Sequence, residues 1–518
     1  MFDFFKRKAA QEERQEYASP SPSPAEGERL NPSLSENMIA VRRLFDNSAD
    51  LVDRRITAGG VEIAVLICEG MVNLQAFAEL MAGPLTSLGT AQPSLGHPCA
   101  SPQAALEHLR AHAVLGADQK EFYTYGELFT FIMSGFAVLL IDGLPLGIAL
   151  GMQGFSFRSI SEPSSEVNVR GSREGFVEPL RINLTMIRRR LKSPLLKFEL
   201  ATVGVRSKTD ICLVYMTDSV SGKMLDKVRG RLGRLRLDVV LESGYLEPFL
   251  EDRPLSLFSG VGTTERPDTL CAKICEGRIA ILVDGTPFAL IVPYLFNEHF
   301  QSVDDYTHRP YYATFIRLLK YTAFFFTILL PGAYVALASF HPELFPNALL
   351  FNIATSEEST PFPLMFEALL IHFIYELMRE AGLRLPRPIG HAVSIVGALV
   401  IGDAAVTAGL IGAPMVMVVA VTAISSFVVP SLYQSITVLR FAFILIGGTL
   451  GLFGMTLGLT AVLCNLCAKH PMGVPQTAPA SPFSLYPMRD VFARAGWRKL
   501  GRRQMRIQDL PGSETDEA

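Results

Sequence analysis

Residues 321–340 read YTAFFFTILLPGAYVALASF, a run of 20 residues without a charged side chain. A helix of this length rises about 30 Å, which matches the thickness of the hydrocarbon core of a membrane. The run therefore predicts a membrane-crossing helix. It divides the chain of 518 residues into a region with the composition of a soluble protein and a largely apolar region that follows.

The apolar character continues well beyond this first run. Residues 321–468 carry only four Lys or Arg and seven Asp or Glu. Further apolar runs that are long enough to be crossing helices lie at 361–378, 388–411, 404–439 and 441–468. The sequence thus predicts a membrane domain of about five or six helices over residues 306–470.

Basic side chains in the predicted loops indicate the orientation. Arg309, Arg317 and Lys320 precede the first run, and Arg379, Arg384 and Arg387 lie in one connection, so both places should be cytoplasmic. Five crossings would leave the basic tail at 471–518 outside. We therefore expect six crossings or an equivalent arrangement with both ends inside. Either residues 347–354 form a re-entrant piece or one long apolar run makes two crossings.

The N-terminal region ahead of the membrane domain has three kinds of sequence. Residues 1–39 are predicted to be a disordered lead, because 9–37 are rich in Pro, Ser and Glu and poor in apolar residues. No apolar run follows the charges at positions 6–8, so we expect no signal peptide and a cytoplasmic location. Beyond the lead, strand and helix patterns alternate as in an α/β protein.

A weak internal repeat predicts two related α/β subdomains, at 40–155 and 201–305, joined by a charged helical connector at 156–200. Residues 61–67 resemble residues 209–215, and each is followed by a helical pattern. Later, Asp142-Gly143 and Asp284-Gly285 each lie between two apolar runs, where Asp-Gly favours a tight hairpin turn. A chance likeness between two hairpins is the alternative to common ancestry.

The composition excludes several functional classes. The net charge is −3 and the Arg188–Arg190 run is diluted by nearby glutamates, which predicts a solvated helix face and no nucleic-acid partner. Seven scattered cysteines do not form a disulfide framework. We find no nucleotide-loop, serine-hydrolase or zinc-protease motif, and Cys464, Cys467 and His470 supply three of four ligands. We therefore expect no enzyme, no cofactor and no metal.

Ionisable residues within the apolar region are the default candidates for function, because they are costly there. Glu367 and Glu376 are nine positions apart and lie on opposite helix faces, so they cannot share a cavity. Glu376 is predicted to lie in a structural ion-pair network that comprises Glu376, Arg379, Glu380 and Arg384. Asp403 either faces a wet passage or bonds to a neighbouring helix. Two glycine pairs spaced by four, Gly447 with Gly451 and Gly454 with Gly458, favour close helix packing.

With these features in place, the chain resembles the A subunits of spore germination receptors, the GerA family, from about residue 45 to 505. In the soluble region, the family motif includes Arg158, Glu162, Glu166, Arg170, Arg173 and Glu174. In the apolar region, the resemblance is carried by the strings at 304–306, 330–337, 340–344, 361–363, 376–386, 395–402 and 473–475.

The resemblance implies a nutrient germinant receptor subunit in the endospore inner membrane, with a cytoplasmic N-terminal region. It implies a transporter-like B subunit and a lipoprotein C subunit as partners. It also implies a homo-oligomer, a ring with five copies as the expected number, around a cation-conducting pore. Within residues 388–411, the predicted pore-lining residues are Gly397, Val400, Asp403 and Ala404.

Two other functions remain open from the sequence. One is a sporulation-specific paralogue that acts with the dipicolinic acid channel and amplifies germination. The other is a non-conducting membrane scaffold, whose soluble region gathers partners while its helices only anchor and oligomerise.

Overall fold

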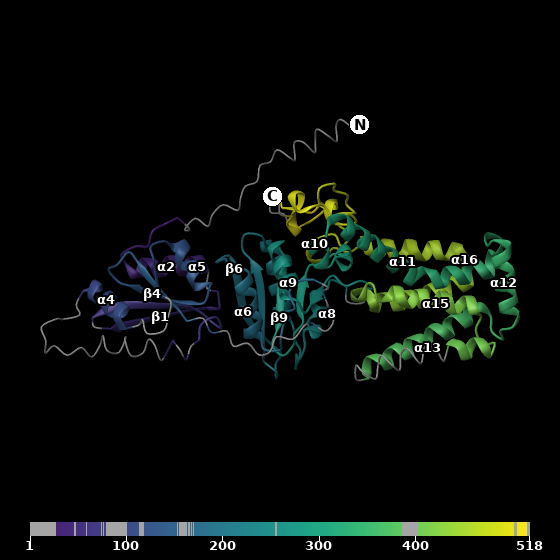
Figure 1. Cartoon of the computed structure of the whole chain (residues 1–518), viewed down its shortest axis with the longest axis horizontal. Helices are drawn as coiled ribbons and strands as arrows, with labels where there is room; N and C mark the ends of the chain where they lie inside the picture. Colours follow the sequence, from purple (N-terminus) through teal and green to yellow (C-terminus); the bar gives the residue numbers. More distant parts are fainter. Residues whose placement is uncertain are drawn as a thin grey trace, which may run out of the picture.

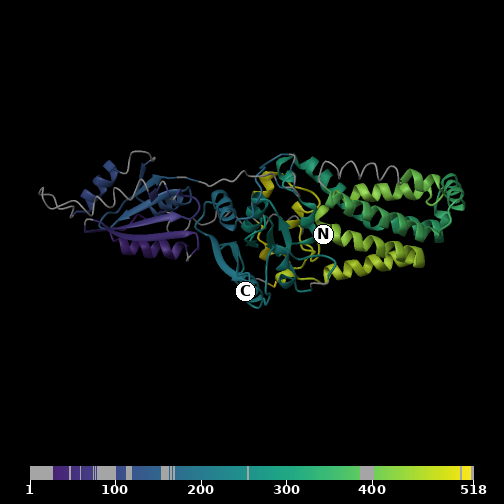
Figure 2. The ribbon, with the colours of Figure 1, turned by 90° about the horizontal axis from the view of Figure 1, so that it is seen from below.

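The structure is a computed structural model. It describes residues 27–45, 48–58, 60–73, 75, 77–78, 101–112, 119–152, 154, 163, 166, 168, 170–253, 256–385, 402–501 and 505–514. Three bodies lie in a row along its long axis, namely a first α/β subdomain, a second α/β subdomain and a helix bundle (Figure 1). A view from below shows the same order, with the C-terminal tail beside the second subdomain (Figure 2).

The first subdomain is a five-stranded antiparallel sheet with helices on both faces. β2 (Val61–Cys68) and β4 (Phe136–Ile141) are apolar runs that are almost wholly buried, as expected for central strands of a sheet covered on both sides. Helices α2 and α5 cover one face and α4 covers the other. In order across the sheet, the strands are β1 (Leu51–Ala58), β2 (Val61–Cys68), β4 (Phe136–Ile141), β5 (Gly147–Gly151) and β3 (Gln119–Phe122). The helices are α2 (Leu34–Phe45), α4 (Pro102–His112) and α5 (Tyr125–Ile132).

The second subdomain repeats this design. Helices α6 and α9 cover one face of its sheet, and α7 covers the other. In order across the sheet, the strands are β6 (Leu196–Val203), β7 (Thr209–Met216), β9 (Ile279–Val283), β10 (Ala289–Val292) and β8 (Gly262–Thr264). The helices are α6 (Leu180–Arg190), α7 (Gly222–Gly233), η2 (Ser243–Tyr245), α8 (Glu247–Leu250), α9 (Pro267–Cys275) and η3 (Phe296–Phe300).

A shared contact confirms that the two subdomains are related. The Asp142 carboxylate accepts a hydrogen bond from the Leu34 amide at the start of α2, at 2.9 Å. The Asp284 carboxylate accepts the equivalent bond from Leu180 at the start of α6, also at 2.9 Å. Both aspartates begin the predicted hairpin turns, and the following glycines have φ of 89° and 93°. The same tertiary contact in both copies makes a chance likeness of two hairpins a poor explanation.

Two predicted boundaries are wrong. The predicted lead at 1–39 reaches too far, since α2 already begins at Leu34, and its residues 1–26 lie outside the described residues. The predicted connector at 156–200 includes α6 and β6, which belong to the second sheet and its core. The boundaries were misplaced because the charged residues of α6 hide the apolar face that it packs against the sheet.

The helix bundle follows a short α10 (Asp304–Thr307). Its helices are α11 (Pro310–Phe340), η4 (Pro342–Leu344), α12 (Asn347–Glu358), α13 (Leu364–Arg384), α15 (Ala413–Ser426), η5 (Pro430–Leu432) and α16 (Tyr433–Cys467). Among the described residues, α11 and the segment Pro430–Cys467 are long and apolar enough to cross a membrane, and α15 is a shorter apolar helix. α12 lies at the end of the bundle far from the α/β subdomains (Figure 1).

α16 is a helical hairpin that turns at Gly451. This glycine has φ 60° and ψ −154°, which no helix contains. A Cβ on Gly458 would lie 3.0 Å from the Phe443 ring, although residues this far apart in a straight helix are separated by about 22 Å. Both ends of α16 reach the second subdomain, since Ser435 bonds to the Leu257 carbonyl and Asn465 to Ser256. One apolar stretch thus passes along the bundle twice.

The glycines of α16 pack against α11. A Cβ on Gly447 would lie 2.3 Å from the Gly332 carbonyl oxygen, and one on Gly332 would lie 2.4 Å from the Phe443 carbonyl oxygen. Real Cβ atoms do not approach so closely, so both positions need glycine. This is the close helix packing that the spacing of the glycines predicts.

The C-terminal tail completes the core of the second subdomain. Met472, Val474, Ala478, Ile507 and Leu510 are buried among the side chains of α7 and the second sheet. Its short helices are η6 (Pro471–Gly473), η7 (Pro487–Asp490), α17 (Trp497–Leu500) and η8 (Ile507–Asp509). The tail and the α/β region therefore lie at the same end of the bundle, which agrees with an even number of crossings.

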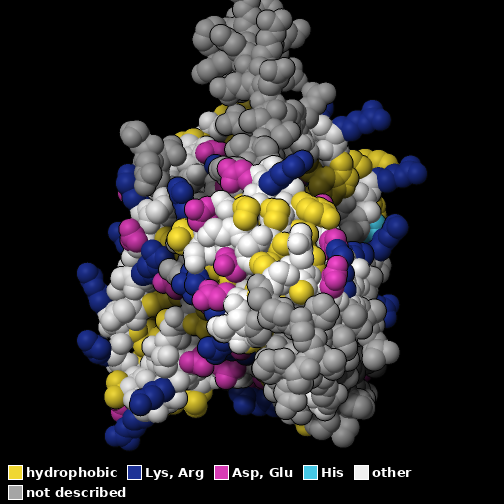
Figure 3. Space-filling model, turned by 90° about the vertical axis from the view of Figure 1, so that its left-hand side faces the viewer, with side chains coloured by type: hydrophobic (Ala, Val, Ile, Leu, Met, Phe, Trp, Pro, Cys, Tyr) yellow, Lys and Arg dark blue, Asp and Glu magenta, His cyan; other side chains and the backbone are white. Residues whose placement is uncertain are grey.

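The free end of the first subdomain carries charges of both signs. Figure 3 shows Lys and Arg side chains interspersed with Asp and Glu on this face. Nucleic-acid surfaces need contiguous basic groups. On the coloured part of this face, the mixture does not form such a patch.

Candidate functional site

The second subdomain, the start of α11 and the tail meet at a buried arginine. Arg317 has no exposed surface, and its Nε donates to Asp305 Oδ2 at 2.7 Å. Its Nη1 donates to Asp490 Oδ1 at 2.8 Å, and the Tyr306 hydroxyl donates to the same carboxylate at 2.8 Å. Burial raises the pKa of Asp490, which its contacts with Arg317 oppose. This Arg317 cluster fastens α10 and the tail to the first bundle helix.

A second charged network supports the same junction from within the subdomain. Glu298 on η3 is almost fully buried and accepts hydrogen bonds from Lys273 and from Arg278, the latter at 2.5 Å. Although burial opposes it, the two cations hold the pKa of Glu298 below its usual value. Because all these charges are compensated, the network fixes η3 on α9.

His299, the next residue of η3, contacts the bundle. Its Nδ1 lies 3.1 Å from the Ser431 hydroxyl in η5, the turn that precedes α16. Burial lowers the pKa of His299 to about 4, so the imidazole is neutral near pH 7. This contact joins the second subdomain directly to the loop between α15 and α16.

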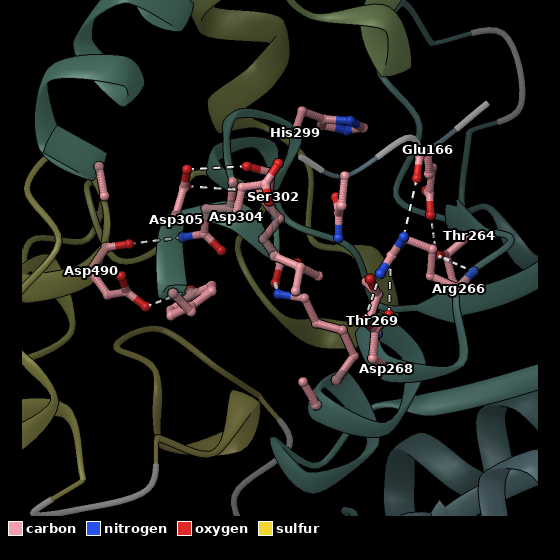
Figure 4. Close-up of a pocket in the computed structure, with 18 of the residues that line it drawn as sticks. Glu166, Thr264, Arg266, Asp268, Thr269, His299, Ser302, Asp304, Asp305 and Asp490 are labelled. Atoms are coloured by element: carbon pink, nitrogen blue, oxygen red, sulfur yellow. Dashed lines mark hydrogen bonds and ion pairs between the residues drawn. The ribbon is translucent and has the colours of Figure 1, made fainter. Parts of the chain in front are cut away.

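A cavity of about 910 Å³ lies between these elements. Figure 4 shows Glu166, Thr264 and Arg266 on one side of it and Asp304, Asp305 and Asp490 on the other, with His299 above. The volume is of the size that small-molecule sites have. Several charges on its wall are paired with each other, such as Arg266 with Asp268 at 2.7 Å and Lys320 with Asp305 at 3.8 Å.

The connector motif lies partly at this cavity. Glu166 accepts a hydrogen bond from Thr264 at 2.7 Å, and burial raises the pKa of Glu166. The Arg170 amide donates to Asp304 at 3.3 Å. Glu174 is not at the cavity but pairs with Arg189 and Arg190 on α6. Arg173 is exposed, and Arg158 and Glu162 lie outside the described residues.

The prediction that the arginine run is a solvated face is wrong for Arg188. Its side chain is 1% exposed, and Nε donates to Asp50 of the first subdomain at 2.7 Å. The guanidinium also lies over the Phe198 ring, 4.5 Å from its centroid. Spacing within one helix cannot reveal a partner in another subdomain, so the ion pair between Arg188 and Asp50 could not be predicted from the sequence.

The ion-pair network predicted on α13 forms two separate pairs. Glu376 lies 3.7 Å from Arg379, and Glu380 lies 2.6 Å from Arg384. The strongest partner of Glu376 was not predicted. Arg440 on α16 is fully buried and lies 3.1 Å away. Arg440 stands alone among apolar residues, and such a charge in a membrane segment usually pairs with an opposite charge. This was a signal in the sequence for the partner of Glu376.

The predicted pore-lining residues are described only in part. Gly397 and Val400 lie outside the described residues, whereas Asp403 and Ala404 lie in a helical segment and are exposed. The described residues on either side of 386–401 lie at opposite ends of the bundle, because α13 ends near the α/β region and Gly409 lies beside Ser359 of the far end.

Comparison with known proteins identifies the family. The model of the Bacillus/Clostridium GerA spore germination protein family matches residues 40–506. The chain belongs to the GerA family. Membership confirms the resemblance drawn from the connector and bundle motifs, and it makes the chain a spore germination protein of the A type.

Relatives in the GerA family match over most of their length. Spore germination protein KA of Bacillus subtilis (strain 168) is 40% identical over 90% of this chain and 85% of its own. Uncharacterized membrane protein YfkQ of the same organism is 37% identical, over 92% and 91%. The N-terminal domain of the A subunit of the Bacillus megaterium spore germinant receptor GerK3 is 32% identical, with a TM-score of 0.42 over 52% of this chain and 98% of that domain.

Proposed function

We propose that this GerA-family chain is the channel-forming A-type subunit of a nutrient germinant receptor in the endospore inner membrane. In this proposal it works with a transporter-like B subunit and a lipoprotein C subunit. Copies of the chain, five as the expected number, surround a cation pathway that opens when nutrient binds. The α/β region and the tail face the cytoplasm.

The exposure of Asp403 is the observation that carries the channel proposal. Its carboxylate lies on the surface of a single chain within an apolar stretch. A charge that faces lipid is expensive, so this carboxylate is better accommodated by water or by a neighbouring subunit. A ring of subunits supplies both, with Asp403 and Ala404 beside the pathway and Gly397 and Val400 as its other predicted residues.

The orientation has independent support. The tail is part of the core of the second subdomain, so both lie on one side of the membrane. Arg309 precedes α11 and Arg384 ends α13, and such basic loops favour the cytoplasmic side. The junction at Arg317 and His299 gives the cytoplasmic region direct contact with α11 and with the turn before α16.

Ion flux from liposomes tests the proposal. The purified chain would be reconstituted alone and with its B and C partners, and release of monovalent cations would be compared for the native chain, Val400→Ala and Asp403→Asn. Flux that depends on these two positions supports the channel. A defined oligomer that never conducts contradicts it and favours the scaffold.

The identity of the partners separates the receptor from the sporulation-specific paralogue. Copurification of the chain with B and C subunits from spores supports the receptor. Copurification with the dipicolinic acid channel instead, without those subunits, supports the amplifying paralogue.

A further inference from the structure

Two acidic side chains approach each other at the far end of the bundle, away from the α/β region. Glu357 lies on α12 and Glu367 on the first turn of α13. Ser356 precedes Glu357, and the turn at Gly412 leads into α15. We call these four residues the outer cluster. It contains none of the predicted pore residues and none of the ion pairs on the later turns of α13.

Glu367 is buried, and a hydrogen bond is found for only one of its two carboxylate oxygens within the described part of the chain. Its side chain has no exposed surface, and Oε1 accepts a hydrogen bond from the Gly412 amide at 2.7 Å. That amide is at the N-terminus of α15, where the helix dipole favours a negative charge. The other oxygen, Oε2, is buried and has no partner among the described residues. A buried carboxylate with a free oxygen is costly unless a proton or a cation compensates it.

Other oxygen atoms surround the same place. The Oε1 atom of Glu357 is also buried without a partner in the described part of the chain. Glu357 and Glu367 are close enough for their charges to interact. A Cβ built on Gly412 would lie 2.9 Å from the Ser356 hydroxyl and 3.4 Å from Glu367 Oε1, so these two oxygens flank one point.

No described cation neutralises the pair. Neither carboxylate takes part in an ion pair with a described Lys, Arg or His, and the charge of Glu367 repels that of Glu357. By contrast, Glu376 on the same helix faces Arg379 and Arg440. Among the described residues, the outer cluster thus combines two carboxylates, each with one oxygen that has no partner, and a hydroxyl, and the positive group beside them is a helix N-terminus.

We propose that the outer cluster binds one divalent cation, held by Glu357, Glu367 and Ser356 and partly hydrated. Hard divalent cations take oxygen ligands, and Mg²⁺ in particular is often held by one or two carboxylates with water completing its shell. The described residues contain no group of three or more His, Cys, Asp or Glu that would form a fully protein-made site. Water and the hydroxyl therefore supply the remaining ligands.

Binding would connect three elements at the far end of the bundle. The cation joins α12 to α13 and, through the Glu367 bond to Gly412, to the start of α15. The segment 402–408, which contains Asp403, leads directly into that start. The cation therefore sets the position of α12 against the elements that adjoin the predicted pore segment, and the site itself does not depend on the channel proposal.

Metal binding to the full-length chain in detergent tests this site. After treatment with chelator, isothermal titration with CaCl₂ and with MgCl₂ would be compared for the native chain, Glu357→Gln, Glu367→Gln and Glu358→Gln. Glu358 is the matched control, because it is the exposed neighbour of Glu357 on α12. Size-exclusion profiles and circular dichroism would establish that every variant is folded.

We expect one saturable site per chain for at least one of the two ions. Removal of a direct carboxylate ligand should weaken it by about tenfold or more, since loss even of a group that only supports a ligand costs that much. Glu358→Gln should bind as the native chain does. Native protein that binds neither ion, or folded Glu357→Gln and Glu367→Gln variants with native affinity, would overturn the proposal. The former result would leave a proton as the group that compensates Glu367.

Discussion

The two α/β subdomains have one architecture but different neighbours. In each, the amide of the first residue of a helix donates a hydrogen bond to the carboxylate of a hairpin aspartate, Asp142 or Asp284. The second subdomain also includes the tail in its core and contacts α11 and the turn before α16. Among the described residues, the first subdomain reaches the bundle only through the second. The repeat accounts for the shared fold, whereas the tail and the contacts at Arg317 and His299 connect the second copy to the helix bundle.

Loss of the Arg317 cluster should have the largest effect, because it separates the second subdomain from the bundle. Arg317→Met leaves the buried Asp305 with Lys320, at 3.8 Å, and removes the ion pair of the partly buried Asp490, which should cost about 3–5 kcal/mol. The thermal unfolding midpoint of the full chain should fall, and trypsin should release the tail early. Arg309→Met is the control, because Arg309 is exposed and directly precedes α11. Its unfolding midpoint should equal that of the native chain. If the two variants were equally stable, the Arg317 cluster would not be what joins the second subdomain and the tail to α11.

Loss of the joint between the subdomains should rank second. Arg188→Met leaves Asp50 unpaired at the interface and should cost about 3 kcal/mol. Arg181→Met is the matched control, because Arg181 makes an exposed pair with Glu69 across the same interface, worth at most about 1 kcal/mol. Limited proteolysis should release the first subdomain from Arg188→Met alone. Release from both variants to the same extent would show that the buried pair is not the joint.

An intermediate effect is expected from pH, and it is specific to the second subdomain. Burial lowers the pKa of His299 from 6.5 to about 4. Between these values the unfolded chain binds a proton that the folded chain does not, so stability falls as the pH falls from 6.5 to 4. His299→Gln should reduce this loss when the unfolding midpoint is measured at several pH values. Parallel pH profiles for both proteins would show that the folded chain does not keep the His299 imidazole neutral.

The smallest effect is expected from loss of the hydrogen bond that both subdomains share. Asp142→Ala and Asp284→Ala each remove one bond to a helix start, which should cost about 1 kcal/mol in either subdomain. Hydrogen exchange should rise in α2 for Asp142→Ala and in α6 for Asp284→Ala. If either variant loosened both helices, the two copies would be one cooperative unit.

The sequence predicted what depends on local pattern. The Asp-Gly hairpins, the apolar run of α11 and the close packing at Gly447 each follow from residue types a few positions apart. The GerA motifs added the family. The turn within α16 was foreseen only as one of two ways to bring both ends of the bundle to one side, because Gly451 has no neighbours in sequence that distinguish a turn from a packing contact.

The sequence could not predict partners that lie far apart in the chain. Three ion pairs, Arg188 with Asp50, Arg317 with Asp490 and Glu376 with Arg440, each join two elements that are far apart in the sequence. The tail was predicted only as basic, because its scattered apolar residues show no periodicity. Its role in the core of the second subdomain depends on tertiary structure alone.

Chemical access to position 403 tests the channel most directly. In vesicles in which the assembled receptor conducts, Asp403→Cys would be treated with a positively charged methanethiosulfonate reagent, and the native chain, with its own cysteines, would be treated in parallel. The account predicts that cation flux through Asp403→Cys falls on modification while native flux does not. Complete modification of Cys at this position with unchanged flux would place Asp403 outside the ion pathway and contradict the account.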